Sequence, residues 1–191
     1  KTKDAQGNYI FYDKPEDAFA NKDARLYGSI IYPGAPFRGM AVPLQAGRKS
    51  LENSVWVSEV AKGGTTDAQG NVITSINGPT TTNDQFINKS GFFFRKFMDE
   101  TPMSSTRGRN SDMWFPRFRF AEAVMIAAEA SFELEKQADA VTYINLVRER
   151  AGIQPLTVVT FGDIVQENRV EFAFEDHRYW DLKRWRIADK V

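Results

Sequence analysis

The stretch that decides the fold is I-V-Q-E-N-R-V-E-F-A-F-E-D-H-R-Y-W-D-L-K-R-W, which runs from Ile164 to Trp185. Charged and large apolar side chains are interleaved throughout it. The carboxylates Glu167, Glu171 and Glu175 follow at intervals of four residues, so a helix would place them along one side. An unpaired buried charge is strongly unfavourable. We therefore predict helical structure that packs against other helices and pairs its charges internally.

Some of these charges have a partner within the stretch itself. Glu175 and Asp181 each have Arg178 three residues away, and Arg184 lies three residues after Asp181. An arginine neighbour lowers the pKa of a carboxylate and favours a permanent ion pair. We therefore expect Arg178 to pair with Glu175 and Asp181.

The same carboxylates are the strongest candidates for catalysis, because a glycosidase needs two carboxylates that flank a cleft, one of them with a raised pKa. Glu167 and Glu171 have no arginine three or four residues away, so their partners should come from other helices. The arginines available there are Arg119, Arg148 and Arg150. Permanent ion pairs argue against acid–base chemistry, and we predict no catalytic residue.

The stretch resembles the C-terminal signature of the SusD/RagB family of outer-membrane nutrient-binding lipoproteins. The matching residues are Glu167, Arg169, Glu171, Phe172, Phe174, Glu175, Asp176, Arg178, Asp181, Leu182, Arg184 and Trp185. Asp176 stands where glycine is commoner in the family.

Apolar residues recur at three- and four-residue intervals in residues 118–136 and 138–151. They are Phe120, Val124, Ala128 and Phe132, then Ala140, Ile144, Val147 and Ala151. Gly152 occupies the position of a glycine that ends a helix. These two segments predict an antiparallel helical hairpin, and residues 161–185 predict a further pair, similar to tetratricopeptide packing.

Three further segments resemble the family. Residues 119–130 and 145–152 resemble R-x-A-E-x-x-L-x-x-A-E-A and N-x-V-R-x-R-A-G, and residues 91–97 resemble G-Y-Y-x-R-K-Y. The signature residues that we expect to be structural are Arg25, Arg119, Glu122, Glu129, Arg148, Arg150, Glu167, Arg169, Glu171, Glu175, Arg178, Asp181, Arg184 and Trp185.

Residues 1–115 are rich in turns and short strands. The pattern T-x-D-A-Q-G-N-x-I occurs at Thr2–Ile10 and at Thr65–Ile73, with glycine where a turn needs positive φ. Both copies predict hairpin turns. A calcium loop is the alternative, but the acidic spacing and the closing glutamate of an EF-hand are absent.

Two segments of this region predict strands. Asn21–Gly34 reads as a strand that leaves a turn and stops at a Pro-Gly pair, and its start partly resembles the N-R-D-P-R-L-Y segment of the family. Asp23 and Arg25 within it should form a structural ion pair. Gly91–Met98 has the apolar density of a buried strand.

Two tryptophans are candidate ligand-binding residues, Trp56 and Trp114. Trp56 lies in N-S-V-W-V-S and could present its indole face to a sugar ring. The competing interpretation is a strand that anchors this long loop to the core. Trp114 is a candidate from its exposure-prone context alone.

Composition excludes several classes of function. The chain of 191 residues has 25 basic and 25 acidic side chains, which gives no net attraction to nucleic acid. It has no cysteine and a single histidine, so a zinc site is not expected, and we predict no metal and no cofactor. No apolar run approaches the roughly 20 residues that span a bilayer.

The resemblance implies a mainly α fold of tetratricopeptide-like hairpins, with a loop-rich subdomain at residues 1–115 and the signature region at 116–191. It also implies a C-terminal portion of a non-catalytic protein whose lipid anchor lies outside this chain. Such a protein captures oligosaccharides at the outer face of the outer membrane and passes them to a TonB-dependent transporter of the SusC type. A peptide-binding RagB-like protein and a helical-repeat interaction scaffold remain alternatives.

Overall fold

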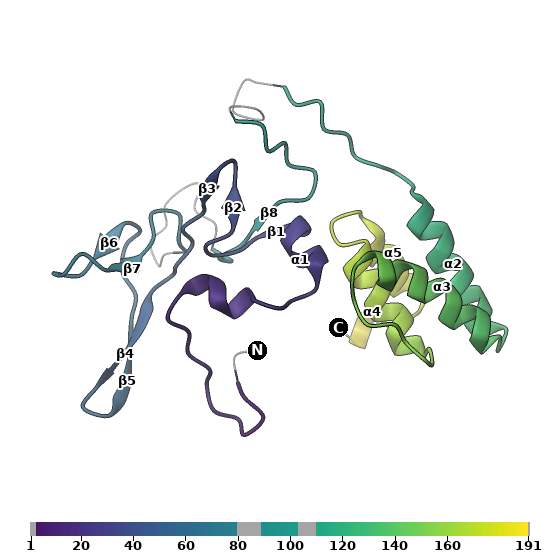
Figure 1. Ribbon diagram of the computed structural model, residues 1–191, viewed down its shortest axis with the longest axis horizontal. Helices are drawn as coiled ribbons and strands as arrows, with labels where there is room; N and C mark the ends of the chain where they lie inside the picture. Colours follow the sequence, from purple (N-terminus) through teal and green to yellow (C-terminus); the bar gives the residue numbers. More distant parts are fainter. Residues whose placement is uncertain (1–2, 80–88, 103–109, 191) are drawn as a thin grey trace. The chain divides into compact units, whose positions relative to one another are not determined.

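The computed structural model describes residues 3–79, 89–102 and 110–190 (Figure 1). The chain forms two compact units, Lys1–Lys22 with Ile30–Ser111, and Asp23–Ser29 with Asp112–Val191. We call them the loop-rich unit and the helical unit. The expected division into domains after residue 115 stays a prediction.

The helical unit contains the long helices of the chain. They are α2 (Phe120–Glu133), α3 (Gln137–Arg150), α4 (Phe161–Glu171) and α5 (His177–Arg184), followed by the short 3₁₀ helix η2 (Ala188–Lys190). Helices α2 and α3 pack against each other as the predicted hairpin, and α4 and α5 form the predicted second pair. The prediction of a mainly α fold with helical hairpins and a few short strands is confirmed.

The ends of these helices follow from local sequence. Thr160 and Asp163 form a reciprocal capping box at the start of α4. Gly152 follows α3 with a φ of 68°, the conformation that glycine adopts most easily after a helix. The turn between α4 and α5 includes Phe174 and Asp176 at φ angles of 66° and 61°.

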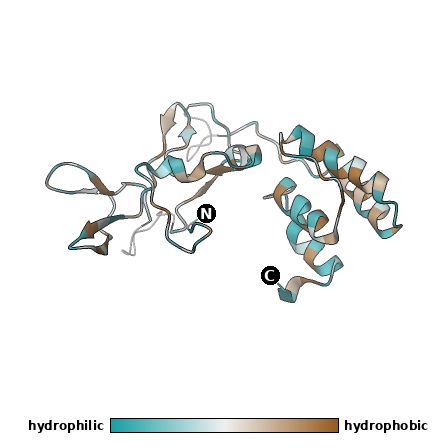
Figure 2. Cartoon of the chain, turned by 60° about the horizontal axis from the view of Figure 1, so that its bottom comes forward, coloured by the Kyte–Doolittle hydropathy of each residue, from teal (hydrophilic) through white to brown (hydrophobic). Residues whose placement is uncertain are grey.

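The core of the helical unit lies between the faces of α2, α3 and α4. Its buried members are Val124, Met125, Ala128, Ala140, Ile144, Val147, Val159, Ile164 and Phe172. Figure 2 shows more hydrophobic residues along α2 than along the helices near the C terminus. One expected core residue is wrong: Phe120, the first residue of α2, is 80% exposed, and the packed surface of the helix begins with Ala121.

The strand expected at Asn21–Gly34 is largely wrong. Residues Ala24–Ser29 form the short helix α1, and only Ile30–Ile31 (β1) is extended. The carboxylate of Asp23 accepts a hydrogen bond from the backbone N–H of Arg25, and the Asp23 carbonyl accepts one from Leu26. This turn at Asp23 starts a helix, and the β-branched residues that favour a strand come only afterwards.

The loop-rich unit is built from two-stranded antiparallel pairs. They are β1 with β8 (Phe93–Phe94), β2 (Pro36–Phe37) with β3 (Met40–Ala41), β4 (Arg48–Glu52) with β5 (Val55–Glu59), and β6 (Thr65–Thr66) with β7 (Val72–Thr74). A 3₁₀ helix, η1 (Pro15–Phe19), precedes them. A small core forms around Ile31, Ala35 and Leu44.

The expected buried strand at Gly91–Met98 is shorter and more exposed than predicted. Only Phe93–Phe94 pairs, and Phe94 is 63% exposed. Within the described residues, β8 pairs only with β1, over two residues. Arg95, which follows β8, pairs with Glu100.

Both copies of the nine-residue pattern form hairpin turns, as predicted. Asp4 accepts hydrogen bonds from the backbone of Gln6 and Asn8 and from the Asn8 side chain. Asp67 accepts the equivalent bonds from Gln69 and Asn71. The carboxylate in each copy therefore holds its own turn together. Among the described residues, no helix is long and apolar enough to cross a membrane.

Candidate functional site

An exposed group of aromatic rings in the loop-rich unit includes one of the two predicted ligand-binding residues. We call Tyr9, Phe11 and Trp56 the aromatic patch. The rings of Phe11 and Trp56 are stacked, with centroids 4.0 Å apart and planes at 15°. The side-chain nitrogen of Lys3 lies 4.8 Å from the centre of the Tyr9 ring, and that of Lys49 lies 6.0 Å from it.

Trp56 is presented by the β4–β5 hairpin, where it pairs with Leu51 across the strands. It is 47% exposed, and its neighbours Val55 and Val57 are 63% and 38% exposed. The segment is a strand, as one interpretation of the sequence required, but it does not anchor the loop in a core. Because Phe11 covers one face of the indole, stacking on a ligand is left to the remainder of the ring.

The rest of this patch is indicated by aromatic residues that lie close together near the N terminus. Tyr9, Phe11 and Tyr12 follow directly after the first hairpin turn, and all three are more than 40% exposed. Three aromatic residues in four positions next to a turn are unusual on a surface unless they contact something.

Trp114 belongs to the helical unit and lies in the segment that leads to α2. It is 84% exposed, so its ring is accessible. Trp56 and Trp114 thus belong to different compact units.

A different set of predicted residues does come together, in a network of buried charges. Glu167 and Glu171 on α4 are each 2% exposed. The Glu167 carboxylate accepts hydrogen bonds from Arg25 at 2.6 Å and Arg148 at 2.8 Å. The prediction that its partners come from other elements is confirmed.

Glu171 is the centre of the network. Its carboxylate receives hydrogen bonds from Arg119 at 2.6 Å, Arg150 at 2.6 Å and Arg25 at 3.0 Å. Arg25 also pairs with Asp23 at 2.7 Å, as predicted. Segments far apart in the sequence therefore meet at one carboxylate, which leaves it no role in acid–base chemistry.

The expected pairs of Arg178 are wrong. Glu175 instead accepts hydrogen bonds from Arg119, at 2.7 and 2.9 Å, and Asp181 accepts one from Arg184 at 3.2 Å. Helix α4 ends at Glu171 and α5 starts at His177, so Glu175 lies in the intervening turn and loses its helical spacing to Arg178.

Two smaller clusters complete the signature. Glu129 on α2 pairs with Arg184 and accepts a hydrogen bond from the indole N–H of Trp185 at 2.8 Å. His177 stacks on Phe172, with centroids 4.5 Å apart, and its Nε2 lies 3.5 Å from Glu122. Helices α2 and α5 are thereby linked by polar contacts.

The ion pairs lower the pKa of two of these carboxylates, Glu171 and Glu129. Burial alone would raise the pKa of Glu171, but the hydrogen bonds from Arg119 and Arg25 outweigh it and hold that pKa below its usual value. The pKa of Glu129 is also lowered. Burial would raise it, but the hydrogen bonds from Arg184 and Trp185 lower it by more. Glu171 and Glu129 therefore stay ionised at neutral pH.

Comparison with known proteins identifies the family. The sequence model of the SusD family matches residues 2–191, and the chain therefore belongs to this family.

Individual relatives agree with this assignment. The chain is 31% identical over 109 residues to SusD-like protein P2 of Formosa agariphila, a match that covers 50% of this chain and 22% of that protein. It is 41% identical over 78 residues to SusD-like protein P25 of the same organism, which covers 37% and 15%.

A solved structure shows the same fold. A SusD-like carbohydrate binding protein from Bacteroides fragilis superimposes with a TM-score of 0.63 at 25% identity, over 95% of this chain and 33% of that one. A second SusD-like protein from that species gives a TM-score of 0.59 at 22% identity, over 90% and 29%. The chain thus spans a third or less of the length of these relatives.

Proposed function

We propose that this chain is part of a non-catalytic protein that binds oligosaccharides at the cell surface and delivers them to a TonB-dependent transporter of the SusC type. The location we propose is the outer face of the outer membrane, with a lipid anchor outside this chain. Membership of the SusD family supports this proposal, as does the similarity to a carbohydrate binding protein of Bacteroides fragilis.

The observation that supports glycan binding by this chain is the aromatic patch. Sugar rings bind to flat apolar surfaces that have polar groups beside them. The patch offers the partly exposed indole of Trp56, held by Phe11, with Lys3 and Lys49 next to Tyr9. Trp114 is a second candidate platform, in the helical unit.

The charge network supports the absence of catalysis. A glycosidase needs a carboxyl group with a raised pKa, whereas Glu171 has a lowered one and Glu167 is held by two arginines. We propose that Glu167 and Glu171 are structural and, with their arginine partners, hold the helices together. The activity that we propose is therefore capture and release of a ligand without bond cleavage.

Calorimetric titration of the chain against neutral polysaccharides, starch among them, and against peptides tests this proposal. We expect saturable binding to a glycan without new reducing ends. Trp56→Ala should weaken binding at least about tenfold, because removal of a central aromatic contact typically costs more than about 1.4 kcal/mol.

Matched variants locate the effect. Trp56→Phe keeps a ring and should retain part of the affinity, whereas Leu51→Ala removes exposed apolar area on the same hairpin and should change little. An effect of Trp114→Ala alone would move the site to the helical unit. Binding to peptides only would replace the proposal with peptide uptake, and cleaved sugar would refute the non-catalytic role.

A further inference from the structure

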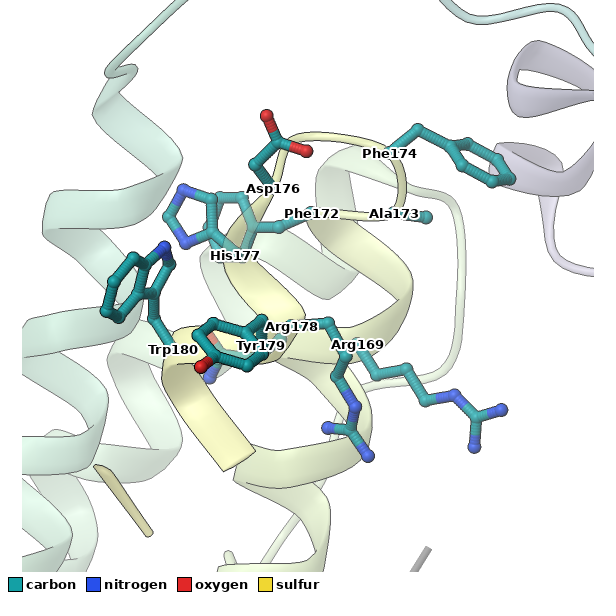
Figure 3. A pocket seen from close by; sticks show the side chains of 10 residues that line it. Arg169, Phe172, Ala173, Phe174, Asp176, His177, Arg178, Tyr179 and Trp180 are labelled. Carbon is teal, nitrogen blue, oxygen red and sulfur yellow. The ribbon is translucent and has the colours of Figure 1, made fainter. Parts of the chain in front are cut away.

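A pocket of about 510 Å³ lies where α4 turns into α5 (Figure 3). It is lined by the end of α4, the intervening turn and the first turn of α5, all within the helical unit. Its lining includes two arginines, Arg169 and Arg178, and two exposed aromatic residues, Tyr179 and Trp180. The proposed glycan platforms, Trp56 and Trp114, are not among its lining residues.

Arg178 is the unusual residue of this pocket. Its Nη1 atom is buried and has no hydrogen-bond partner in the part of the chain that the structure describes. A buried polar atom without a partner is costly, and more so on a charged group. Nearby arginines of the signature behave differently, since Arg119, Arg148 and Arg184 all pair with carboxylates.

Arg169 adds a second positive charge. It is exposed at the end of α4 and forms no ion pair within the described residues. Both residues line the pocket, and in the view of Figure 3 their side chains extend in the same direction. The one carboxylate in the lining, Asp176, lies at the opposite end of the view.

Two guanidinium groups that line one pocket and have no ion pair within the described residues offer N–H donors to an oxyanion. Guanidinium recognises carboxylate and sulfate oxygens through paired N–H donors and prefers them to neutral acceptors. Tyr179 and Trp180, which are 60% and 67% exposed, place ring surface beside this charge. A ligand with an anionic substituent on an otherwise apolar ring face fits both features.

We propose that this pocket binds an anionic substituent of a saccharide, a carboxylate or a sulfate ester, through Arg169 and Arg178. The proposal rests on glycan binding as the function and narrows it to acidic glycans. The aromatic rings supply contact area, and the two arginines select the charged sugar.

Small anions test the pocket independently of glycan binding. The whole chain is titrated with sodium sulfate and with sodium galacturonate at constant ionic strength, while NMR follows the arginine Nε–Hε signals. Signals assigned to Arg169 and Arg178 should shift and saturate, and sodium chloride should not reproduce this. The anion that acts at the lower concentration distinguishes sulfate from carboxylate recognition. No saturable shift with either anion would overturn the proposal.

Polymers then test the ligand class. Arg169→Gln/Arg178→Gln should weaken binding of polygalacturonate or dextran sulfate at least about tenfold, since hydrogen bonds to charged groups each contribute about that factor. Binding of a neutral glycan should be unchanged. If the double variant does not fold, Arg169→Gln alone serves, because Arg169 is exposed and its loss should still weaken acidic ligands severalfold.

The control removes the same charge elsewhere. Lys136→Gln/Arg186→Gln changes two exposed basic residues that do not line the pocket. Equal weakening by both double variants would show general charge attraction and overturn the proposal. If Trp56→Ala removes neutral glycan and leaves the sulfate shifts intact, the two sites are separate. If no glycan binds at all, the proposed function fails while the small-anion titration still decides this site.

Discussion

At the scale of single residues, Glu171 lies in a charge-rich stretch of sequence and is nevertheless buried. Its carboxylate is almost fully buried and is contacted by Arg25, Arg119 and Arg150. Exposed ion pairs contribute little to stability, but the loss of one partner from a buried network leaves the others uncompensated. The penalty for removing the central carboxylate should therefore be large.

We predict that Glu171→Ala lowers the free energy of unfolding by about 3–5 kcal/mol, the range typical of broken buried pairs. Urea denaturation followed by circular dichroism measures it. Glu149→Ala is the control, because Glu149 is exposed on α3, and it should change stability by no more than about 0.5 kcal/mol. Equal effects of the two substitutions would show that the network does not hold the fold.

The same residue predicts a dependence on acid. The pKa of Glu171 is lowered in the folded state, so its contribution is complete above the unfolded value of 4.5 and is lost as the pH falls through the folded pKa. The stability of the natural chain should therefore fall more steeply below about pH 4.5 than that of Glu171→Gln, which cannot titrate there. Urea unfolding at a series of pH values measures both slopes, and parallel curves would contradict the linkage.

At the scale of elements, the turn between α4 and α5 explains a departure from the family pattern. Asp176 stands where glycine is commoner, and it has a φ of 61° without a side-chain hydrogen bond to the start of α5. The left-handed conformation destabilises a non-glycine residue by roughly 1–2 kcal/mol. Replacement by glycine removes this strain, but glycine is more flexible in the unfolded chain, which cancels about half of the gain.

We accordingly predict that Asp176→Gly raises the free energy of unfolding by up to about 1 kcal/mol. Asp176→Ala retains the Cβ atom and should bring no such gain. Thermal melting of the three proteins measures the difference. A loss of stability in the glycine variant would mean that the aspartate makes a contribution that its conformation does not reveal.

The helices also show which elements could be predicted from the sequence. The apolar spacing that gave α2 and α3 is a local property, and Ala140, Ile144, Val147 and Ala151 are all buried as expected. The spacing failed at Phe120, the first residue of α2, whose side chain is exposed although Ala121 beside it packs on the core. It failed for Asn21–Gly34 as well, where a turn at Asp23 starts a helix before the strand-forming residues are reached.

At the scale of the whole molecule, the chain combines a helical unit with a well-defined core and a loop-rich unit made of separate two-stranded pairs. In the described part of the chain each strand has a single partner, so a strand-like sequence does not by itself place its residues in a core. This is why Gly91–Met98 was predicted to be buried and is largely exposed, and why Trp56 lies on a strand without reaching the core.

The sequence by itself determined the family, the helical hairpins, the two hairpin turns and the need for arginine partners from other helices, because these depend on local spacing and on the cost of burying charge. Only the tertiary structure decided which arginine serves which carboxylate, that Phe11 stacks on Trp56, and that Arg169 and Arg178 share a pocket without a carboxylate partner. Those contacts join positions whose proximity depends on where helices end and how they pack, which no local spacing specifies.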